Sequence, residues 1–234
     1  MKMSQISQNL QRIRKKIFKQ AAKDTIKIVA VTKTRPTTQI NEAISCGVTS
    51  IGENRVQEAE QKFQQIKRPV EKRFIGRLQS NKVKKATALF DTIDSVHSYA
   101  LADKISKHCA PTQKEQRVLL QINTGKEDSK SGFSLCEKSE IIKCFSLSNI
   151  KIEGLMTIAP LTKDKTKIKK AFQKLKELFL ETNSALPKAQ QMTELSMGMS
   201  DDLLVAIKEG STMVRVGTAI FGERKRDALF KKMV

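Results

Sequence analysis

Residues 26–32 read Ile-Lys-Ile-Val-Ala-Val-Thr, and Lys33 and Thr34 follow them directly. Apolar and β-branched residues dominate this run, which predicts a buried strand. Pro36 then opens a helical pattern that runs to Cys46, and Gly47 stops it. This unit, a short strand followed by an amphipathic helix, recurs along the rest of the chain.

Eight strands of this kind are predicted, and they cover residues 26–32, 48–52, 73–76, 89–94, 117–123, 151–158, 194–197 and 212–217. The longest helical patterns between them cover residues 36–46, 53–66, 78–88, 98–108, 134–145, 163–182 and 201–208, and one more helix precedes the first strand at residues 3–22. Strict alternation demands parallel strands with right-handed crossovers, and eight units close a barrel. We therefore predict an α/β fold, a single (β/α)8 TIM-type barrel domain over residues 1–234 with an extra N-terminal helix. The alternative, a doubly wound open sheet, usually has fewer strands and does not account for eight.

The composition is strongly basic. The 234 residues carry 44 Lys+Arg against 24 Asp+Glu, a formal net charge of +20. Such an excess suggests nucleic-acid binding, because phosphate neutralisation supplies most non-specific affinity. The positive residues are mostly lysine and are spread along the chain, and with no Trp and one Tyr few side chains could stack on bases. We therefore expect no specific nucleic-acid partner, and we expect most of the charge on outer helix faces, such as residues 163–176.

Hydropathy and cysteine spacing indicate a soluble cytoplasmic protein. No apolar run approaches the roughly 20 residues of a membrane helix, and the basic N-terminus lacks the apolar segment of a secretory signal. The four cysteines show no C-x-x-C spacing and no paired histidines nearby, which favours reduced thiols over a metal site. We expect no membrane association and no bound metal.

Chemistry in such a barrel lies at the carboxyl ends of the strands. Lys33 follows the first strand, where desolvation and neighbouring positive charge would lower its pKa and make it a nucleophile toward carbonyls. A solvated lysine past the strand end is the alternative. Asn54 follows the second strand and could point to the same mouth, although helix capping is the favoured explanation when this residue is considered alone.

The last two strands carry a second group of candidates. Ser196 lies at the end of the seventh strand, and Gly217 and Thr218 follow the eighth, where barrels commonly bind phosphate through backbone N–H groups. Arg215 lies two residues before Gly217 and shares its face; if that face is inward, the buried cation needs partners. A lysine that faces a phosphate-binding site suggests pyridoxal phosphate as the cofactor, but enzymes that act on sugar phosphates could use similar residues.

The same residues resemble a known family. Motifs along essentially the whole chain are similar to the YggS/PROSC family of pyridoxal-phosphate homeostasis proteins, which is related to the N-terminal barrel of alanine racemase. The matching stretches are residues 30–34 (Ala-Val-Thr-Lys-Thr), 52–58, 74–76, 78–82, 129–132, 154–156, 195–202 and 211–222.

The resemblance implies a role for each candidate. Lys33 would form the internal aldimine, a Schiff base, with pyridoxal 5'-phosphate, and Asn54 would lie beside the cofactor. Arg215 would face the pyridine nitrogen. The phosphate would be held by three residues, Ser196, Gly217 and Thr218.

The resemblance also implies a function in vitamin B6 homeostasis without an established reaction, because an arginine opposite the ring nitrogen weakens the ring as an electron sink. Apo forms of pyridoxal-phosphate enzymes are the implied partners, and we expect a monomer. The alternative is a weakly active amino-acid racemase. Alanine racemases take their second base, a tyrosine, from a further C-terminal domain, whereas the only tyrosine here, Tyr99, is predicted in a helix away from the mouth.

Three positions need separate mention. The family often has Trp-His before Phe-Ile-Gly, where this chain has Lys72 and Arg73, and Arg77 stands where proline or histidine is common. We expect this added charge to act on the outer part of the site without touching the aldimine. Lys130 is a candidate peripheral contact for an anion or aldehyde, with a solvated loop lysine as the alternative.

Overall fold

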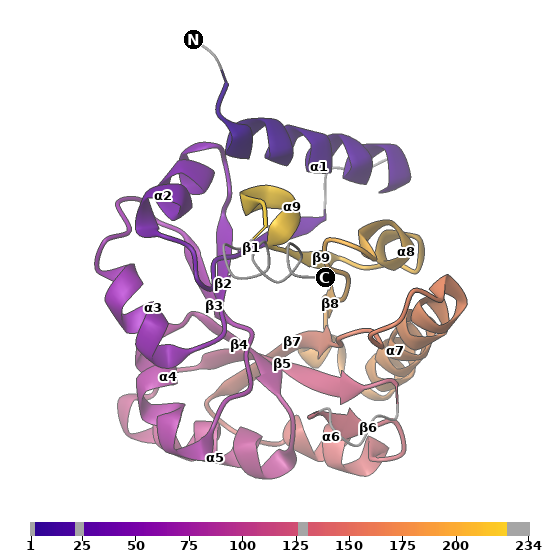
Figure 1. The fold of residues 1–234 in the computed structure, drawn as a ribbon. Coiled ribbons are helices and arrows are strands. Elements are labelled where there is room, and N and C mark those ends of the chain that lie inside the picture. The colour runs from indigo at the N-terminus through magenta and orange to yellow at the C-terminus, as the bar shows by residue number, and fades with distance from the viewer. Residues whose placement is uncertain (1–2, 22–25, 126–130, 224–234) are drawn as a thin grey trace.

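A closed barrel of parallel strands forms the centre of the protein (Figure 1). The computed structural model describes residues 3–21, 26–125 and 131–223. The barrel strands are β1 (Lys27–Val31), β2 (Ser50–Glu53), β3 (Glu71–Phe74), β4 (Thr92–Val96), β5 (Gln116–Asn123), β7 (Ile150–Met156), β8 (Glu194–Ser196) and β9 (Met213–Val216). Each pairs in parallel with the next, β4 pairs with β5, and β1 pairs with β9. The sheet therefore closes on itself, which confirms the barrel over the open sheet.

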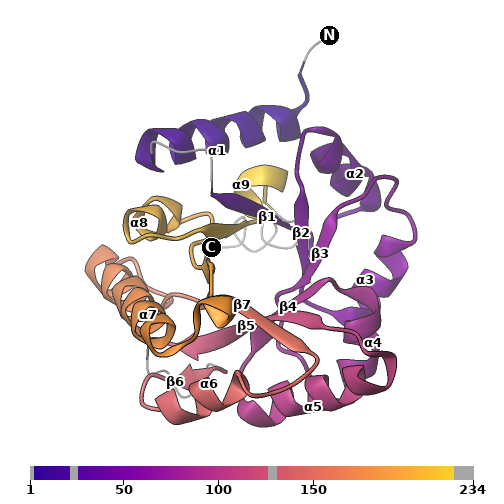
Figure 2. The ribbon, with the colours of Figure 1, turned by 180° about the vertical axis from the view of Figure 1, so that it is seen from behind.

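Helices surround this barrel, as both views show (Figures 1 and 2). They are α1 (Gln5–Ala21), α2 (Thr37–Ser45), α3 (Val56–Phe63), α4 (Val83–Leu89), α5 (Tyr99–Cys109), α6 (Lys138–Cys144), α7 (Lys165–Ala185), α8 (Leu203–Lys208) and α9 (Thr218–Phe221). The predicted extra helix α1 buries Ile6, Leu10, Ile13 and Ile17 and packs against α2, α8 and α9. Exposed lysines of α7, such as Lys165 and Lys174, carry part of the charge excess on its outer face, as predicted.

Several predicted boundaries differ from the structure, and helix α4, predicted from residue 78, begins only at Val83. Three other differences have a visible cause. Glu53 ends strand β2 instead of opening a helix, because its carboxylate turns inward and is fully buried. Leu89 ends helix α4 instead of opening a strand, and the next N–H, on Phe90, still donates to the Ala86 carbonyl. Ser134 belongs to a short strand, β6 (Phe133–Ser134), which pairs with the end of β5, so helix α6 begins later than predicted.

The interior of the protein has an apolar part and a charged part. Two clusters of apolar side chains lie between the strands and the helices. The amino-terminal part of the barrel, in contrast, holds a basal ion cluster, which consists of Lys27, Glu71, Arg73, Asp94, Arg117, Glu153 and Glu194. Arg73 on β3 reaches Glu194 on β8 at 2.7 Å, and these strands are not neighbours, so the contact crosses the barrel interior.

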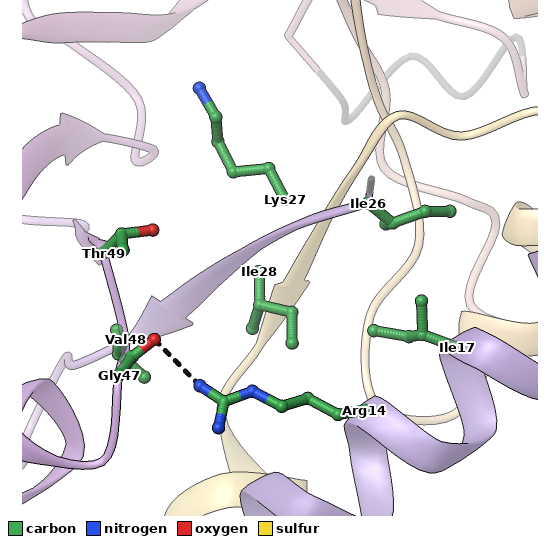
Figure 3. A pocket seen from close by; sticks show the side chains of 8 residues that line it. All are labelled: Arg14, Ile17, Ile26, Lys27, Ile28, Gly47, Val48 and Thr49. Atoms are coloured by element: carbon green, nitrogen blue, oxygen red, sulfur yellow. Dashed lines mark hydrogen bonds between the residues drawn. The ribbon is translucent and has the colours of Figure 1, made fainter. Parts of the chain in front are cut away.

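A cavity of about 490 Å³ opens between α1 and the amino-terminal ends of β1 and β2 (Figure 3). Arg14 lies at its edge and donates to the carbonyls of Cys46 and Gly47, at 3.0 and 2.8 Å. Lys27 also lines it, with its ammonium in the basal ion cluster. This end of a barrel contributes to stability, whereas chemistry lies at the opposite end.

Candidate functional site

The predicted site residues converge on four neighbouring strands. β2, β1, β9 and β8 lie side by side in this order, with Val31 opposite Gly52 and Ala30 opposite Val216. The side chains or backbone at their carboxyl ends come from Asn54 (after β2), Lys33 (after β1), Arg215, Gly217 and Thr218 (in or after β9) and Ser196 (at the end of β8). The structure therefore places all six predicted residues on one arc of the barrel mouth.

Lys33 is half-buried in a tight turn directly after β1. The next residue, Thr34, has φ of 63°, a left-handed conformation that a β-branched residue rarely adopts. Its N–H donates to Glu58 Oε1 at 2.5 Å and its hydroxyl to the Lys33 carbonyl at 2.6 Å. Such strain costs on the order of 1–3 kcal/mol and persists only where the surroundings hold it. Hydrogen bonds around Thr34 therefore hold the turn that carries Lys33 in place.

A buried polar network beneath this turn holds it. Lys62 Nζ, on α3, donates to the Thr32 carbonyl at 2.7 Å, to Glu53 Oε1 at 2.8 Å and to Glu58 Oε1 at 2.6 Å. The Thr32 hydroxyl also donates to Glu53 Oε1, at 2.7 Å. Burial raises the pKa of Glu53, whereas hydrogen bonds from Lys62 and Thr34 outweigh burial at Glu58 and lower its pKa. Lys62 thus ties the ends of β1 and β2 to α3.

The segment after β9 forms a small cup. A Cβ on Gly217 would lie 3.3 Å from Val31 Cβ, so this backbone passes close to β1. The Ser200 hydroxyl, from the loop after β8, accepts the Ala219 N–H at 3.3 Å. Arg35, in the loop after β1, donates to the carbonyls of Phe221 and Gly222 and fixes the end of α9. Loops after three adjacent strands therefore meet here.

Arg215 points inward, as its spacing from Gly217 suggests, and it finds the partners that a buried cation requires. Its Nη1 donates to the Ser196 carbonyl at 3.0 Å and to Ser196 Oγ at 2.7 Å, and its Nη2 donates to the Thr157 carbonyl at 2.7 Å. All these acceptors are uncharged. Burial lowers the pKa of Arg215, and the charge of Asp94 acts in the opposite direction.

Ser196 and Ser200 differ in what they can contact. Ser196 is fully buried, and its hydroxyl accepts from Arg215. Ser200 is half-exposed beside the Gly217–Thr218 segment. The strand pattern alone does not place Ser200 in the cup, although its position in the loop directly after β8, two residues beyond Gly198, is a signal that could have identified it.

Asn54 carries an unused polar atom. Its side-chain oxygen is buried and has no hydrogen-bond partner among the residues that the structure describes. Gly76 packs directly against the Asn54 backbone, because a Cβ there would lie 2.2 Å from the Asn54 carbonyl oxygen. A cavity of about 170 Å³ lies beside Asn54, with Arg77 and Gln121 in its wall.

The departures from the family pattern lie in different places. Arg73 does not act on the outer part of the site, so that expectation is wrong: its side chain is fully buried inside the barrel. Lys72 lies over the Phe63 ring, 5.2 Å from its centroid, and Arg77 is exposed at the mouth. Lys130 lies outside the described residues. Tyr99 begins α5, with Lys143 of α6 over its ring.

No group of His, Cys, Asp and Glu suited to hold a metal ion occurs in the described part of the chain. Nor is any helix found there that is both long and apolar enough to span a bilayer.

Comparisons with known proteins cover nearly the whole chain. The family described as alanine racemase, N-terminal domain, matches residues 1–225. The pyridoxal phosphate homeostasis protein of Pasteurella multocida is 41% identical over 228 residues, 95% of this chain and 96% of that protein. The protein of the same name from Aquifex aeolicus is 40% identical and covers 94% of this chain and 97% of that one.

Solved structures agree with these matches. PipY of Synechococcus elongatus, solved with pyridoxal phosphate bound, superposes with a TM-score of 0.83 at 33% identity, over 93% of this chain and all of that one. An alanine racemase of Clostridium difficile is 18% identical with a TM-score of 0.75, and the chain spans 60% of it, which shows the fold alone. By sequence and by fold, the chain belongs to the alanine racemase N-terminal domain family and, within it, to the pyridoxal phosphate homeostasis proteins.

Proposed function

We propose that this protein binds pyridoxal 5'-phosphate at the carboxyl ends of β2, β1, β9 and β8 and serves in homeostasis of that cofactor without catalysing a reaction of its own. The observation that carries the proposal is the meeting of Lys33, the inward cation Arg215 and the Gly217–Thr218 segment on adjacent strands. In the bound state Lys33 Nζ replaces the aldehyde oxygen of the cofactor as a Schiff base, and the oxygen leaves as water.

The residues present fit this cofactor. Gly217 and Thr218 offer backbone and hydroxyl groups to the phosphate, and the Ser200 hydroxyl lies beside them. The buried, unpaired oxygen of Asn54 supplies a hydrogen-bond acceptor at the side of the site. We propose that Ser196 contributes to holding the phosphate and also orients the Arg215 guanidinium, since its hydroxyl accepts a hydrogen bond from that guanidinium.

Arg215 supports the non-catalytic part of the proposal. A guanidinium is a permanent donor, so the ring nitrogen opposite it must accept a hydrogen bond and stays unprotonated. Pyridoxal phosphate stabilises carbanions through a protonated ring, so this arrangement weakens that chemistry. Tyr99 offers no second base for racemisation from its place under Lys143.

Visible absorption tests the cofactor assignment. The protein loaded with pyridoxal phosphate should be yellow, and borohydride should bleach the band by reducing the Schiff base. Lys33→Ala should lose the band, while Lys84→Ala, which removes an exposed lysine of helix α4, should keep it. An unchanged spectrum in Lys33→Ala would overturn the assignment.

A racemase assay tests the second part. We expect no conversion of L-alanine to D-alanine at enzyme-like rates, and such turnover would contradict the non-catalytic role.

We further propose that the protein acts in the cytoplasm as a monomer and passes its cofactor to apo enzymes. Mixing the loaded protein with an apo pyridoxal-phosphate enzyme should restore that enzyme's activity; no recovery would contradict the transfer.

A further inference from the structure

Both neighbours of Lys33 in the chain are held by one helix. The carbonyl of Thr32, before Lys33, accepts from Lys62 Nζ at 2.7 Å, and the N–H of Thr34, after it, donates to Glu58 Oε1 at 2.5 Å. Glu58 and Lys62 lie four residues apart on α3 and pair with each other at 2.6 Å. The backbone of Lys33 is therefore held from both sides by α3.

The two contacts differ in what else they support. Lys62 also binds the fully buried carboxylate of Glu53, so its loss would disturb β2 as well as the turn. Glu58 is 23% exposed, and without it Lys62 keeps its contacts to Glu53 and to the Thr32 carbonyl. Glu58 can therefore be replaced while the link between α3 and the two strands stays in place.

Thr34 is the residue that depends on Glu58. It is exposed, and its φ of 63° is a left-handed conformation that is costly for a β-branched residue. The hydrogen bond from its N–H to Glu58 offsets that cost. Without this acceptor water can bind the N–H in any conformation, so the turn should relax and the backbone of Lys33 should move with it.

We propose that Glu58 is a positioning residue for Lys33: by accepting the Thr34 N–H, it holds the turn in the conformation in which Lys33 Nζ can bond to the cofactor aldehyde. In that step the bond from Nζ to the aldehyde carbon forms, the carbon–oxygen double bond breaks, and the oxygen leaves as water with the two amine protons. This inference rests on the proposed function. Glu58 should act on the covalent bond and not on the phosphate, because the Gly217–Thr218 segment follows β9 whereas Glu58 lies on α3.

The test compares two ligands in the full chain by titration calorimetry. Pyridoxal 5'-phosphate can form the bond to Lys33, whereas pyridoxine 5'-phosphate has a hydroxymethyl group in place of the aldehyde and cannot. In Glu58→Ala the Kd of pyridoxal phosphate should rise about tenfold, the factor that backbone strain of this kind makes in an equilibrium constant. The Kd of pyridoxine phosphate should stay within about twofold. Loss of a negative charge would act on both phosphates alike, so the comparison of the two ligands removes that effect.

Three further proteins separate positioning from a general structural role. Glu58→Gln retains an acceptor oxygen for the Thr34 N–H and should keep the Kd of pyridoxal phosphate within about threefold. Glu60→Ala is the matched control, because it removes a 42% exposed glutamate of the same helix that pairs with Lys85, and it should change neither Kd. In a protein that already carries Lys33→Ala, the addition of Glu58→Ala should leave the Kd of pyridoxal phosphate unchanged, because the bond that Glu58 supports is gone.

Equal changes in Kd for the two ligands in Glu58→Ala, or no change in either, would overturn the proposal. So would a Glu58→Gln or Glu60→Ala protein that loses as much affinity as Glu58→Ala, or a further loss when Glu58→Ala is added to Lys33→Ala. If Glu58→Ala does not fold, Glu58→Asp decides by the same comparison, since it keeps the charge beside Lys62 but is one methylene too short for Thr34. Colourless unmodified protein would refute the proposed function itself, whereas coloured protein that is insensitive to Glu58→Ala refutes only this inference.

Discussion

Lys62 is predicted to be one of the main stabilising residues of the barrel mouth. Its ammonium group uses all three donors, on the Thr32 carbonyl, Glu53 and Glu58, while its side chain is only 12% exposed. In Lys62→Met the apolar stem remains but the donors are lost. Glu58 is 23% exposed and can be solvated, whereas Glu53 is fully buried and would retain only the Thr32 hydroxyl.

Most of the unfolding free energy lost in Lys62→Met should therefore come from the unpaired carboxylate of Glu53. Leaving one partner of a buried pair unpaired costs about 3–5 kcal/mol, a large part of the ~5–15 kcal/mol that stabilises a typical domain. Lys85→Met is the matched control, because Lys85 pairs with Glu60 at 3.0 Å but is 55% exposed, and it should cost about 1 kcal/mol or less. Lys62→Met/Glu53→Gln should recover about 2 kcal/mol, since the buried charge is gone.

The pH dependence follows from the same groups. The folded pKa of Glu53 is raised by burial, so its charge reduces stability as the pH rises above 4.5 through that pKa. The folded pKa of Glu58 is lowered, so its contribution is present above 4.5 and is lost as the pH falls. Loss of Lys62 should raise the pKa of both carboxyl groups, because Lys62 lowers each of them. The loss of unfolding free energy in Lys62→Met should therefore become smaller from pH 8 toward pH 4.5, as these carboxylates take up protons.

Urea unfolding followed by far-ultraviolet circular dichroism measures these free energies, which suits a chain without tryptophan. A cost below about 1 kcal/mol at pH 8 would refute the reasoning, because that value is typical of an exposed pair. A cost that does not change between pH 8 and pH 4.5 would also refute it.

Three further predictions concern other parts of the fold. Gly154→Ala should prevent folding, because its Cβ would lie 1.8 Å from the Glu194 carbonyl oxygen. Gly222→Ala has no atom within 4 Å of the new Cβ but a φ of 81°, so it should lower the free energy of unfolding by only about 1 kcal/mol. Comparable yields of soluble protein from the two variants would contradict this prediction. Thr218→Val with Ser196→Ala, and separately Ser200→Ala, should each weaken pyridoxal phosphate binding about tenfold by titration, and equal affinity would contradict the phosphate cup. Burial raises the pKa of the Cys144 thiol to about 12, so a thiol reagent at pH 8 should modify exposed Cys136 and leave Cys144 unmodified until urea is added; prompt reaction at Cys144 would contradict its burial.

The sequence predicts the barrel well because its signal is local. A short apolar run predicts each strand, and apolar residues at helical spacing predict each helix. Parallel pairing then follows from the alternation of strands and helices. Lys33, Asn54, Ser196, Gly217 and Thr218 could be placed at the mouth by the same means, since the carboxyl end of a strand is a position in the sequence.

What the sequence does not predict depends on distant contacts. Arg73 finds Asp94 21 residues away and Glu194 121 residues away, so its burial inside the barrel could not be deduced from the strand pattern. Glu53 is buried at the end of β2, where Lys62 from the next helix pairs with it, and helix periodicity carries no sign of that contact. Ser200 joins the cup only because α9 folds back over the loop after β8.

Peptide mapping of the reduced protein examines the proposed role of Lys33. The protein is loaded with pyridoxal phosphate, reduced with borohydride, digested, and analysed by mass spectrometry. The proposal predicts that the phosphopyridoxyl group is found on Lys33, because that lysine lies in the strained turn after β1, and β1 pairs with β9, which carries Arg215 and leads into the Gly217–Thr218 segment. The group on Lys130, Lys62 or any other lysine, with Lys33 unmodified, would contradict it.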